Sequence, residues 1–178
     1  MCNSCTLGRP LQWDMETPAR TKRTAILSLV LWVAVSLGAG ALGSLLGGPG
    51  RDPWYRELAK PDLNPPGWVF GPVWTVLYIL MGVAAWGVWR RIGRPLAKPA
   101  LVLFATQLVL NAIWSGIFFG LHEIGWALVD LVALWVVLAA TTVLFVRVRT
   151  WSGLLLLPYL AWVTFAGVLN YSIWMLNR

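Results

Sequence analysis

The sequence is poor in the residues from which metal and catalytic sites are most often built. Its 178 residues contain one histidine, His122, and two cysteines, Cys2 and Cys5. A metal site normally needs about four ligands, so we expect no bound metal and no cofactor, and we favour a reduced, non-functional cysteine pair. The sequence also lacks a glycine-rich phosphate loop and any residues that suggest a nucleophile triad. The hydrolase and kinase classes are therefore excluded.

Charge is also scarce, and it is nearly absent from five long apolar stretches. Charged residues make up 12% of the chain and hydrophobic residues 58%. Each stretch is long enough, at ~1.5 Å per residue, to cross a hydrocarbon core ~30 Å thick. A backbone in lipid must satisfy its own hydrogen bonds, and continuous apolar runs favour helices over a barrel. The sequence predicts an all-α integral membrane protein, a five-transmembrane-helix bundle with spans at about residues 25–46, 68–89, 100–121, 124–146 and 151–176.

The start of the chain has two interpretations. We expect residues 1–23 to be a polar, disordered tail and residues 24–178 to form the membrane domain. The basic residues Arg20–Arg23, the apolar run after them and Ala39–Ala41 also resemble a cleavable signal peptide. The apolar stretch continues to Leu46, which favours a retained span.

The net charge of +7 reflects where the basic residues lie along the chain. Ten of the 14 basic residues fall in the tail, the second loop and the fourth loop, which share one side of a five-span protein. The positive-inside rule makes that side cytoplasmic. We therefore predict a cytoplasmic N-terminus, a C-terminus on the opposite side, a lipid bilayer as the surroundings and no nucleic-acid partner.

Small residues recur at every fourth position in the first and third stretches. Such stripes let helix backbones approach closely in lipid. Packing within one bundle and a homodimer interface are both consistent with them. The stripes are formed by Ser36, Gly40 and Ser44, by Ala39, Gly43 and Gly47, and by Ala112, Gly116 and Gly120.

The loop after the first stretch is long, stiff and aromatic. Its prolines restrict the backbone, and its aromatic residues are too apolar for a freely solvated linker. We expect it to fold over the bundle as a lid, with aromatic residues lying at headgroup level as the alternative. The expected lid residues are Trp54, Tyr55, Lys60, Pro61, Pro65 and Pro66.

Polar side chains inside the stretches share helix faces with aromatic rings. Gln107, Asn111, Trp114 and Phe118 are spaced by four, three and four residues and therefore share one face. Amides are costly against lipid, so this face should turn into the bundle. We predict a cavity with aromatic walls, although plain packing is the alternative for any single ring. Similar faces contain Phe70, Trp74 and Tyr78, then Trp126, Asp130 and Ala133, then Tyr159, Trp162, Phe165, Ala166, Leu169 and Asn170.

Asp130 is the single ionisable residue deep within a stretch. Such a residue is a functional candidate by default. It could couple proton movement to transport, or it could hydrogen-bond to a neighbouring helix, and the second role is favoured because no basic residue lies deep in another stretch.

Ordered motifs along the chain resemble the tryptophan-rich sensory protein or translocator protein (peripheral benzodiazepine receptor) family, TspO/MBR. The resemblance extends from about Ala25 to the C-terminus. The motifs include Trp54-Tyr55-x-x-Leu58-x-Lys60-Pro61, Asn64-Pro65-Pro66-x-Trp68, Gly71-Pro72-x-Trp74-x-x-x-Tyr78, Gln107-Leu108-x-Leu110-Asn111-x-x-Trp114, Gly125-Trp126-Ala127-Leu128-x-Asp130 and Pro158-Tyr159-Leu160-Ala161-Trp162.

The resemblance implies a five-helix bundle, often dimeric, whose pocket beneath the first loop binds porphyrins, sterol-like molecules and benzodiazepine-type ligands. We therefore expect a membrane receptor or carrier for tetrapyrroles such as protoporphyrin IX, acting in tetrapyrrole metabolism or the stress response. The alternatives are light-dependent porphyrin breakdown, in which residues matching Trp74 and Trp162 take part, and a tetrapyrrole or sterol transporter. Positions matching the family pocket are Phe70, Gly71, Val73, Trp74, Asn111, Trp114, Trp126, Val129, Ala133, Trp162, Ala166 and Leu169, to which Gln107 and Asp130 are added from their polar character.

One departure from the family pattern concerns sterols. The family's sterol motif has a basic residue four places after a tyrosine. Here Met175 stands four places after Tyr171, and Arg178 comes too late for the motif. Such motifs are weak patterns, so sterol recognition through this one is doubtful.

Overall fold

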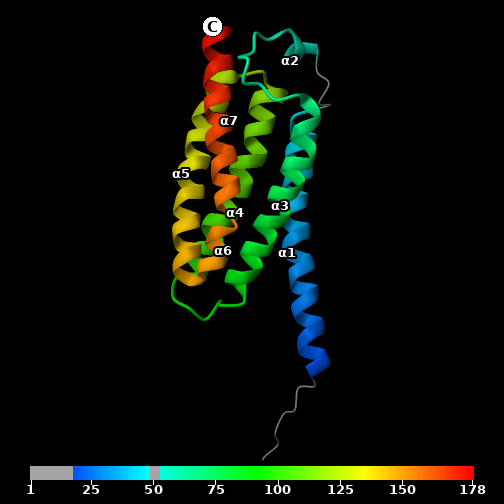
Figure 1. The fold of residues 1–178 in the computed structure, drawn as a ribbon, viewed down its shortest axis with the longest axis vertical. Helices are drawn as coiled ribbons and strands as arrows, with labels where there is room; N and C mark the ends of the chain where they lie inside the picture. The colour runs from blue at the N-terminus through cyan, green and yellow to red at the C-terminus, as the bar shows by residue number, and fades with distance from the viewer. Residues whose placement is uncertain (1–17, 49–52) are drawn as a thin grey trace, which may run out of the picture.

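Long helices make up nearly all of the protein in a computed structural model that describes residues 18–48 and 53–178 (Figure 1). Within these residues, five helical segments are long and apolar enough to cross a membrane, and α4 with η1 and α6 with α7 each count as one of them. The predicted all-α bundle of five spans is confirmed. The elements in chain order are α1 (Pro18–Leu46), α2 (Pro53–Glu57), α3 (Gly67–Trp89), α4 (Ala97–Ser115), the π-helical turn η1 (Gly116–Gly120), α5 (Ile124–Val148), α6 (Thr150–Leu154) and α7 (Leu157–Leu176).

The element boundaries differ from the expected spans at three places. α1 begins at Pro18, inside the segment expected to be a tail, while Cys2 and Cys5 lie outside the described residues. The third span ends in the π-helical turn, where the N–H of Leu121 donates to the carbonyl of Gly116 at 2.9 Å. The fifth span is broken between α6 and α7. Its apolar run continues through the break, so hydropathy alone could not reveal it.

α1 packs against α3 and α4. At Gly82 in α3, an added Cβ would lie 2.5 Å from the Cα of Val33 in α1. At Gly43 in α1, an added Cβ would lie 3.4 Å from the Cα of Ala112 in α4, and at Gly120 it would lie 2.6 Å from the carbonyl oxygen of Leu46. The small residues of α1, α4 and η1 therefore form contacts within one bundle.

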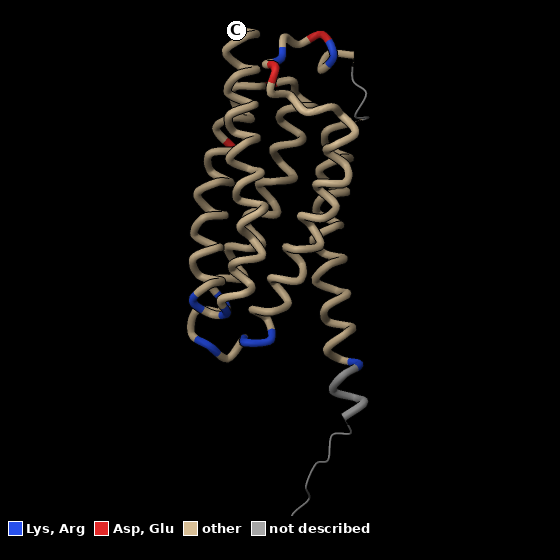
Figure 2. Tube along the Cα trace, in the orientation of Figure 1, with Lys and Arg blue, Asp and Glu red and all other residues tan. Residues whose placement is uncertain are grey.

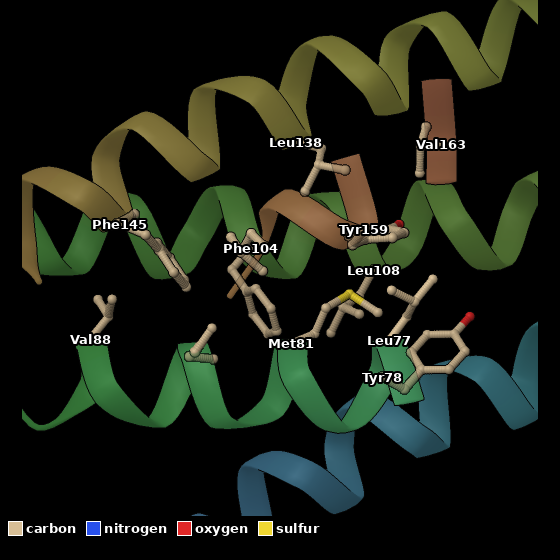
Figure 3. Close-up of a cluster of buried hydrophobic side chains, with 14 of the residues drawn as sticks. Leu77, Tyr78, Met81, Val88, Phe104, Leu108, Leu138, Phe145, Tyr159 and Val163 are labelled. Atoms are coloured by element: carbon tan, nitrogen blue, oxygen red, sulfur yellow. The ribbon is translucent and has the colours of Figure 1, made fainter. Parts of the chain in front are cut away.

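A tightly packed hydrophobic core fills one half of the bundle (Figure 3). Met81, Phe104, Leu138, Phe145 and Tyr159 are all fully buried there. The rings of Phe104 and Phe145 stack with their centres 5.8 Å apart. These residues come from the second half of α3, the first half of α4, the second half of α5 and the start of α7, so the core lies away from the α2 loop.

The two ends of the bundle differ in charge (Figure 2). The end formed by the α3–α4 loop and the α5–α6 corner, here called the basic end, carries Arg90, Arg91, Arg94, Lys98, Arg147 and Arg149. The opposite end, here called the loop end, holds α2, the residues up to Gly67, the α4–α5 connection and the C-terminus. It mixes both signs, with Arg56, Glu57, Lys60, Asp62, Glu123 and Arg178.

Candidate ligand-binding cavity

A cavity of about 590 Å³ lies in the half of the bundle nearest the loop end. α1, α3, α4, η1 and α7 form its walls, and residues of the first loop contribute Tyr55, Asn64 and Pro65. Eight of the predicted pocket residues line it, and no charged side chain of the described residues does. These eight are Phe70, Gly71, Trp74, Asn111, Trp114, Trp162, Ala166 and Leu169.

Asn111 forms the centre of a buried polar network beside the cavity. Its Oδ1 accepts a hydrogen bond from the hydroxyl of Tyr78. Its Nδ2 donates to the hydroxyl oxygen of Tyr159 at 3.1 Å. Both ends of the amide are thereby occupied, which fixes its orientation and avoids the cost of a buried unpaired polar group. Asn111 thus connects α3, α4 and α7 at the inner end of the cavity.

Trp114 is held by a second amide. Its Nε1 donates to Oδ1 of Asn170 at 3.1 Å, and Nδ2 of Asn170 donates to the carbonyl of Ile124 at 3.0 Å. The indole also stacks on Phe118 of η1, with ring centres 5.2 Å apart. Trp114 is therefore a fixed wall of the cavity, joined to α7 and through it to the start of α5.

Trp74 and Trp162 face the cavity from α3 and α7. Trp74 stacks on Tyr78 at 5.4 Å and meets Tyr159 edge-on at 6.0 Å. Trp162 meets Phe70 edge-on at 5.9 Å, which brings the two helices together near the loop end. Edge-to-face and offset stacked pairs are favourable geometries for aromatic rings.

The first loop lies over the cavity. The hydroxyl of Tyr55 donates to Oδ1 of Asn64 at 3.2 Å, and its ring packs edge-on against Phe119 at 5.4 Å. Burial raises the pKa of Tyr55 above its ordinary value, with the hydrogen bond to Asn64 acting in the opposite direction. Lys60 stands over the Tyr55 ring, its Nζ 4.7 Å from the ring centre.

Further contacts, made by Asn177 and His122, attach this loop to the rest of the bundle. Asn177, just after α7, accepts a hydrogen bond from the N–H of Ala59 at 2.9 Å and donates to the carbonyl of the same residue at 2.9 Å. Trp54 stacks on His122 with ring centres 4.2 Å apart. Of the other expected lid residues, Pro65 lines the cavity, whereas Pro61 and Pro66 do not.

Four predicted residues lie outside the cavity, contrary to the expectation that their face turns into it. Trp126, Val129, Asp130 and Ala133 line a separate cleft of about 460 Å³ on the outer side of α5. Trp126 is 67% exposed and Val129 59%. The inward face of α5 is instead the row of buried residues Ala127, Leu131, Leu134 and Leu138. Aromatic and acidic residues on α5 therefore do not indicate which face of this helix turns into the bundle, because either face of an apolar helix can lie against lipid.

Two further predicted residues support the cavity without lining it. Gln107 is fully buried one turn below Asn111, with Nε2 3.8 Å from the sulfur of Met81 and with no hydrogen-bond partner for Oε1. Val73 packs against the main hydrophobic core. The face that Gln107 shares with Asn111 turns into the bundle, but a sequence pattern does not report depth along the bundle.

The sequence pattern does not predict that α1 forms a wall of the cavity. Gly40, Gly43, Ser44 and Gly47 line the cavity. The recurrence of small residues was visible in the sequence, but it was considered only as a means of helix packing. Small side chains also leave room beside the facing helices. In α1 they allow close helix packing and also leave space for the cavity.

Comparison with known proteins identifies the family to which this arrangement belongs. The family model of the TspO/MBR family matches residues 32–175. The chain belongs to the TspO/MBR family. Among its relatives, the tryptophan-rich protein TspO of Chlorobaculum tepidum is 42% identical over 156 residues, covering 85% of this chain and 97% of that protein. The translocator protein of Homo sapiens is 44% identical over 148 residues, covering 82% and 87%. Protein CrtK of Rhodobacter capsulatus is 44% identical over 140 residues, covering 78% and 86%.

Membership of the TspO/MBR family agrees with the five spans. The matched region begins inside α1 and ends one residue before the end of α7, so it contains every element that lines the cavity. The protein is therefore an integral, multi-pass membrane protein. Among the described residues, no group of His, Cys, Asp and Glu could hold a metal ion.

Proposed function

We propose that this protein is a membrane receptor or carrier that binds a planar tetrapyrrole, such as protoporphyrin IX, in the cavity beneath the first loop. The observation that carries the proposal is that Trp74, Trp114 and Trp162 line one cavity to which none of the described charged side chains contributes. Flat indole faces offer stacking surfaces to a flat apolar macrocycle. The names of the relatives, which include translocator proteins and tryptophan-rich TspO proteins, support a receptor or transport role.

The size of the cavity supports a ligand of this class. Pockets for drug-sized molecules usually measure about 300–1,000 Å³ and are apolar with a few polar groups. The volume of about 590 Å³ falls in this range, and Asn111 and Ser115 are among the polar groups at its surface. Asn111 already uses both ends of its amide on Tyr78 and Tyr159, so stacking and burial contribute most of the affinity.

No charged side chain of the described residues lines the cavity, so the carboxylates of the ligand need a position at its edge. Among those residues, Lys60 is a basic residue placed against the cavity wall, through its contact with the Tyr55 ring. Its Nζ also donates to the carbonyls of Arg56 at 3.2 Å and Leu58 at 3.1 Å, which holds the ammonium group at the loop end. A macrocycle inserted from this end would keep its carboxylates near Lys60.

Titration of protoporphyrin IX into the purified protein, followed by tryptophan quenching, tests the proposal. Replacing both Trp74 and Trp162 by Ala should weaken binding by about tenfold or more, because two stacking surfaces are removed. The matched control is Trp126→Ala, which removes an indole outside the cavity and should leave the affinity unchanged. Equal affinity in the double variant and the unmodified protein would remove the cavity assignment.

The dimethyl ester of protoporphyrin IX separates stacking from charge. Lys60→Met should weaken binding of the free acid severalfold and leave binding of the ester unchanged. If both ligands lose affinity equally, Lys60 supports the structure of the first loop and does not pair with the carboxylates of the ligand.

A second candidate function is light-dependent breakdown of the bound porphyrin by dioxygen. It is favoured by the presence of two indoles, Trp74 of α3 and Trp162 of α7, in the lining of the same cavity. Trp162→Phe should then abolish the loss of porphyrin absorbance under light and oxygen while binding persists. Breakdown at the rate measured in protein-free micelles would exclude it.

Proton-coupled transport through Asp130 has weaker support. Asp130 lies in the outer cleft and not in the cavity, and its Oδ2 has no hydrogen-bond partner. Equal rates of porphyrin movement across liposome membranes for Asp130→Asn and the unmodified protein would exclude this coupling. Sterol-like molecules remain an alternative ligand class, to be tested by competition against bound protoporphyrin IX.

A further inference from the structure

The basic end carries positive charges that no described carboxylate lies near. Arg90 and Arg91 follow α3, and Arg149 forms the corner between α5 and α6. The described acidic residues lie at the loop end or in the first two turns of α5 (Figure 2). They are Glu57, Asp62, Glu123 and Asp130.

Two of these arginines are placed on tryptophan rings. The guanidinium carbon of Arg90 lies 5.1 Å from the ring centre of Trp86, and that of Arg149 lies 4.5 Å from the ring centre of Trp151. A guanidinium group stacked on an indole is held in place while its N–H groups remain free to donate at its edge. Each pair therefore presents a guanidinium group of fixed orientation, whose forked N–H groups can donate hydrogen bonds.

Trp151 of the second pair lies where α6 packs on the end of α3, whereas the indole N–H of Trp86 donates to the hydroxyl of Ser28 in α1 at 3.1 Å. An added Cβ at Gly87, the neighbour of Trp86, would lie 2.8 Å from Cζ2 of Trp151. The absence of a side chain at Gly87 thus allows the Trp151 ring to lie directly on α3. Partial burial, and then the charges of Arg91 and Arg90, lower the pKa of Arg149. A bound anion would offset the positive charge that Arg90 and Arg91 exert on Arg149.

Arg94 has a different role at the same end. Its Nη1 donates to the carbonyl of Val148 at the end of α5, at 2.8 Å. Cations at a helix C-terminus satisfy free carbonyls and interact well with the helix dipole. This bond holds the α3–α4 loop against the α5–α6 corner, so the two segments that carry Arg90, Arg91 and Arg149 are fixed relative to each other.

We infer that Arg90, Arg91 and Arg149, supported by Trp86 and Trp151, form a binding site for the phosphate group of an anionic phospholipid. A lipid is favoured over a soluble anion because the site lies at the ends of membrane spans and contains the half-buried tryptophans typical of the membrane interface. Basic pockets between transmembrane helices bind anionic headgroups in this way. The site is at the opposite end from the cavity and does not depend on the function proposed for it.

Native mass spectrometry of the full-length protein tests this site, with phosphatidylglycerol as the probe and phosphatidylcholine as the uncharged comparison. The double substitution Arg90→Gln with Arg149→Gln should weaken phosphatidylglycerol binding about 25-fold, at about fivefold for each charge removed. Arg90→Lys with Arg149→Lys keeps the charge but removes the planar guanidinium groups that stack on the indoles. This variant should bind phosphatidylglycerol with intermediate affinity. Unchanged thermal unfolding in phosphatidylcholine would show that both variants fold.

The matched control is the pair Arg56→Gln and Arg178→Gln at the loop end. It removes the same charge, including an arginine 5.6 Å from the ring centre of Trp174. This control should retain phosphatidylglycerol binding within about twofold. An equal loss in the control would mean that net charge, not a built site, governs binding. Equal binding of phosphatidylcholine, full affinity in the lysine variant, or equally effective competition by soluble glycerol phosphate would each overturn the proposal.

Discussion

Asn111 shows how much of the bundle can depend on one amide. A single side chain holds the hydroxyls of Tyr78 and Tyr159, which belong to different helices, and all three groups are buried. The low dielectric of the interior strengthens such bonds and also makes an unpaired partner costly. Asn111 therefore positions two cavity-side rings as well as contributing a polar group of its own.

We predict that Asn111→Ala destabilises the protein by about 2–4 kcal/mol, because two buried hydroxyls lose their partner. Reversible unfolding in mixed micelles would measure the change. Asn64→Ala is the control, since it removes one hydrogen bond at a half-buried position in the loop and should cost less than about 1.5 kcal/mol. Equal losses in the two variants would show that the buried Asn111 network contributes no more than a single half-buried hydrogen bond.

At the residue scale, the sequence could predict which way most polar groups face but not what they contact. Gln107 and Asn111 share a helix face and carry the same functional group, and both were assigned to the pocket. The structure places Asn111 at the cavity and Gln107 one turn deeper in the packed core. The difference is set by the large side chains of other helices, such as Met81 and Tyr159, whose positions depend on tertiary packing.

Among the helices, α1 is attached to the bundle by the closest backbone approaches. Within the most apolar window of α1 only 6% of residues are buried, compared with 33% in each of the other spans. It therefore has few large side chains packed inside the bundle. Its contacts depend instead on glycines such as Gly82, Gly43 and Gly120, where the facing chain passes within van der Waals distance.

Gly82→Ala should accordingly displace α1 from α3. The new Cβ would lie 2.5 Å from the Cα of Val33 and 2.9 Å from the carbonyl oxygen of Trp32, and neither backbone atom can move without shifting the helix. We expect a destabilisation of about 1–3 kcal/mol, as for other overpacking substitutions. A thermal unfolding series in one detergent would measure it.

Gly38→Ala is the matched control on α1, because an added Cβ there meets nothing within 4 Å. It should be neutral or stabilising by up to about 1 kcal/mol, since alanine is the better helix former. A neutral Gly82→Ala would mean that α1 is held loosely enough to move aside.

At the element scale, hydropathy located the spans but not their irregularities. The ends of α3 and the start of α5 agree with the expected spans within one residue. The π-helical turn η1 was not expected, because the residues from Gly116 to Gly120 continue the apolar run. The turn lies where Gly116 and Gly120 approach Leu46 of α1, which is a contact between helices. Sequence periodicity carries no information on such contacts.

The whole molecule is divided into a filled half and a hollow half. Large buried side chains from α3, α4, α5 and α7 fill the half toward the basic end (Figure 3). Toward the loop end, glycines of α1 replace such side chains, and the cavity lies beside them. The filled half provides a stable frame, while the cavity is covered by the first loop. A homodimer remains a prediction, and it would need a surface other than the small residues already packed within the bundle.

The orientation of this asymmetric molecule in the membrane is the last prediction. The basic end should face the cytoplasm, because loops rich in Lys and Arg are retained there. Two single-cysteine variants test it in a background carrying Cys2→Ser and Cys5→Ser. Leu63→Cys lies at a position that is 68% exposed in the first loop, and Gly93→Cys lies in the α3–α4 loop, where an added Cβ meets nothing within 4 Å. A membrane-impermeant maleimide should label Leu63→Cys in intact cells and Gly93→Cys only after permeabilisation. The reverse pattern would place the loop end, with the first loop and the C-terminus, on the cytoplasmic side.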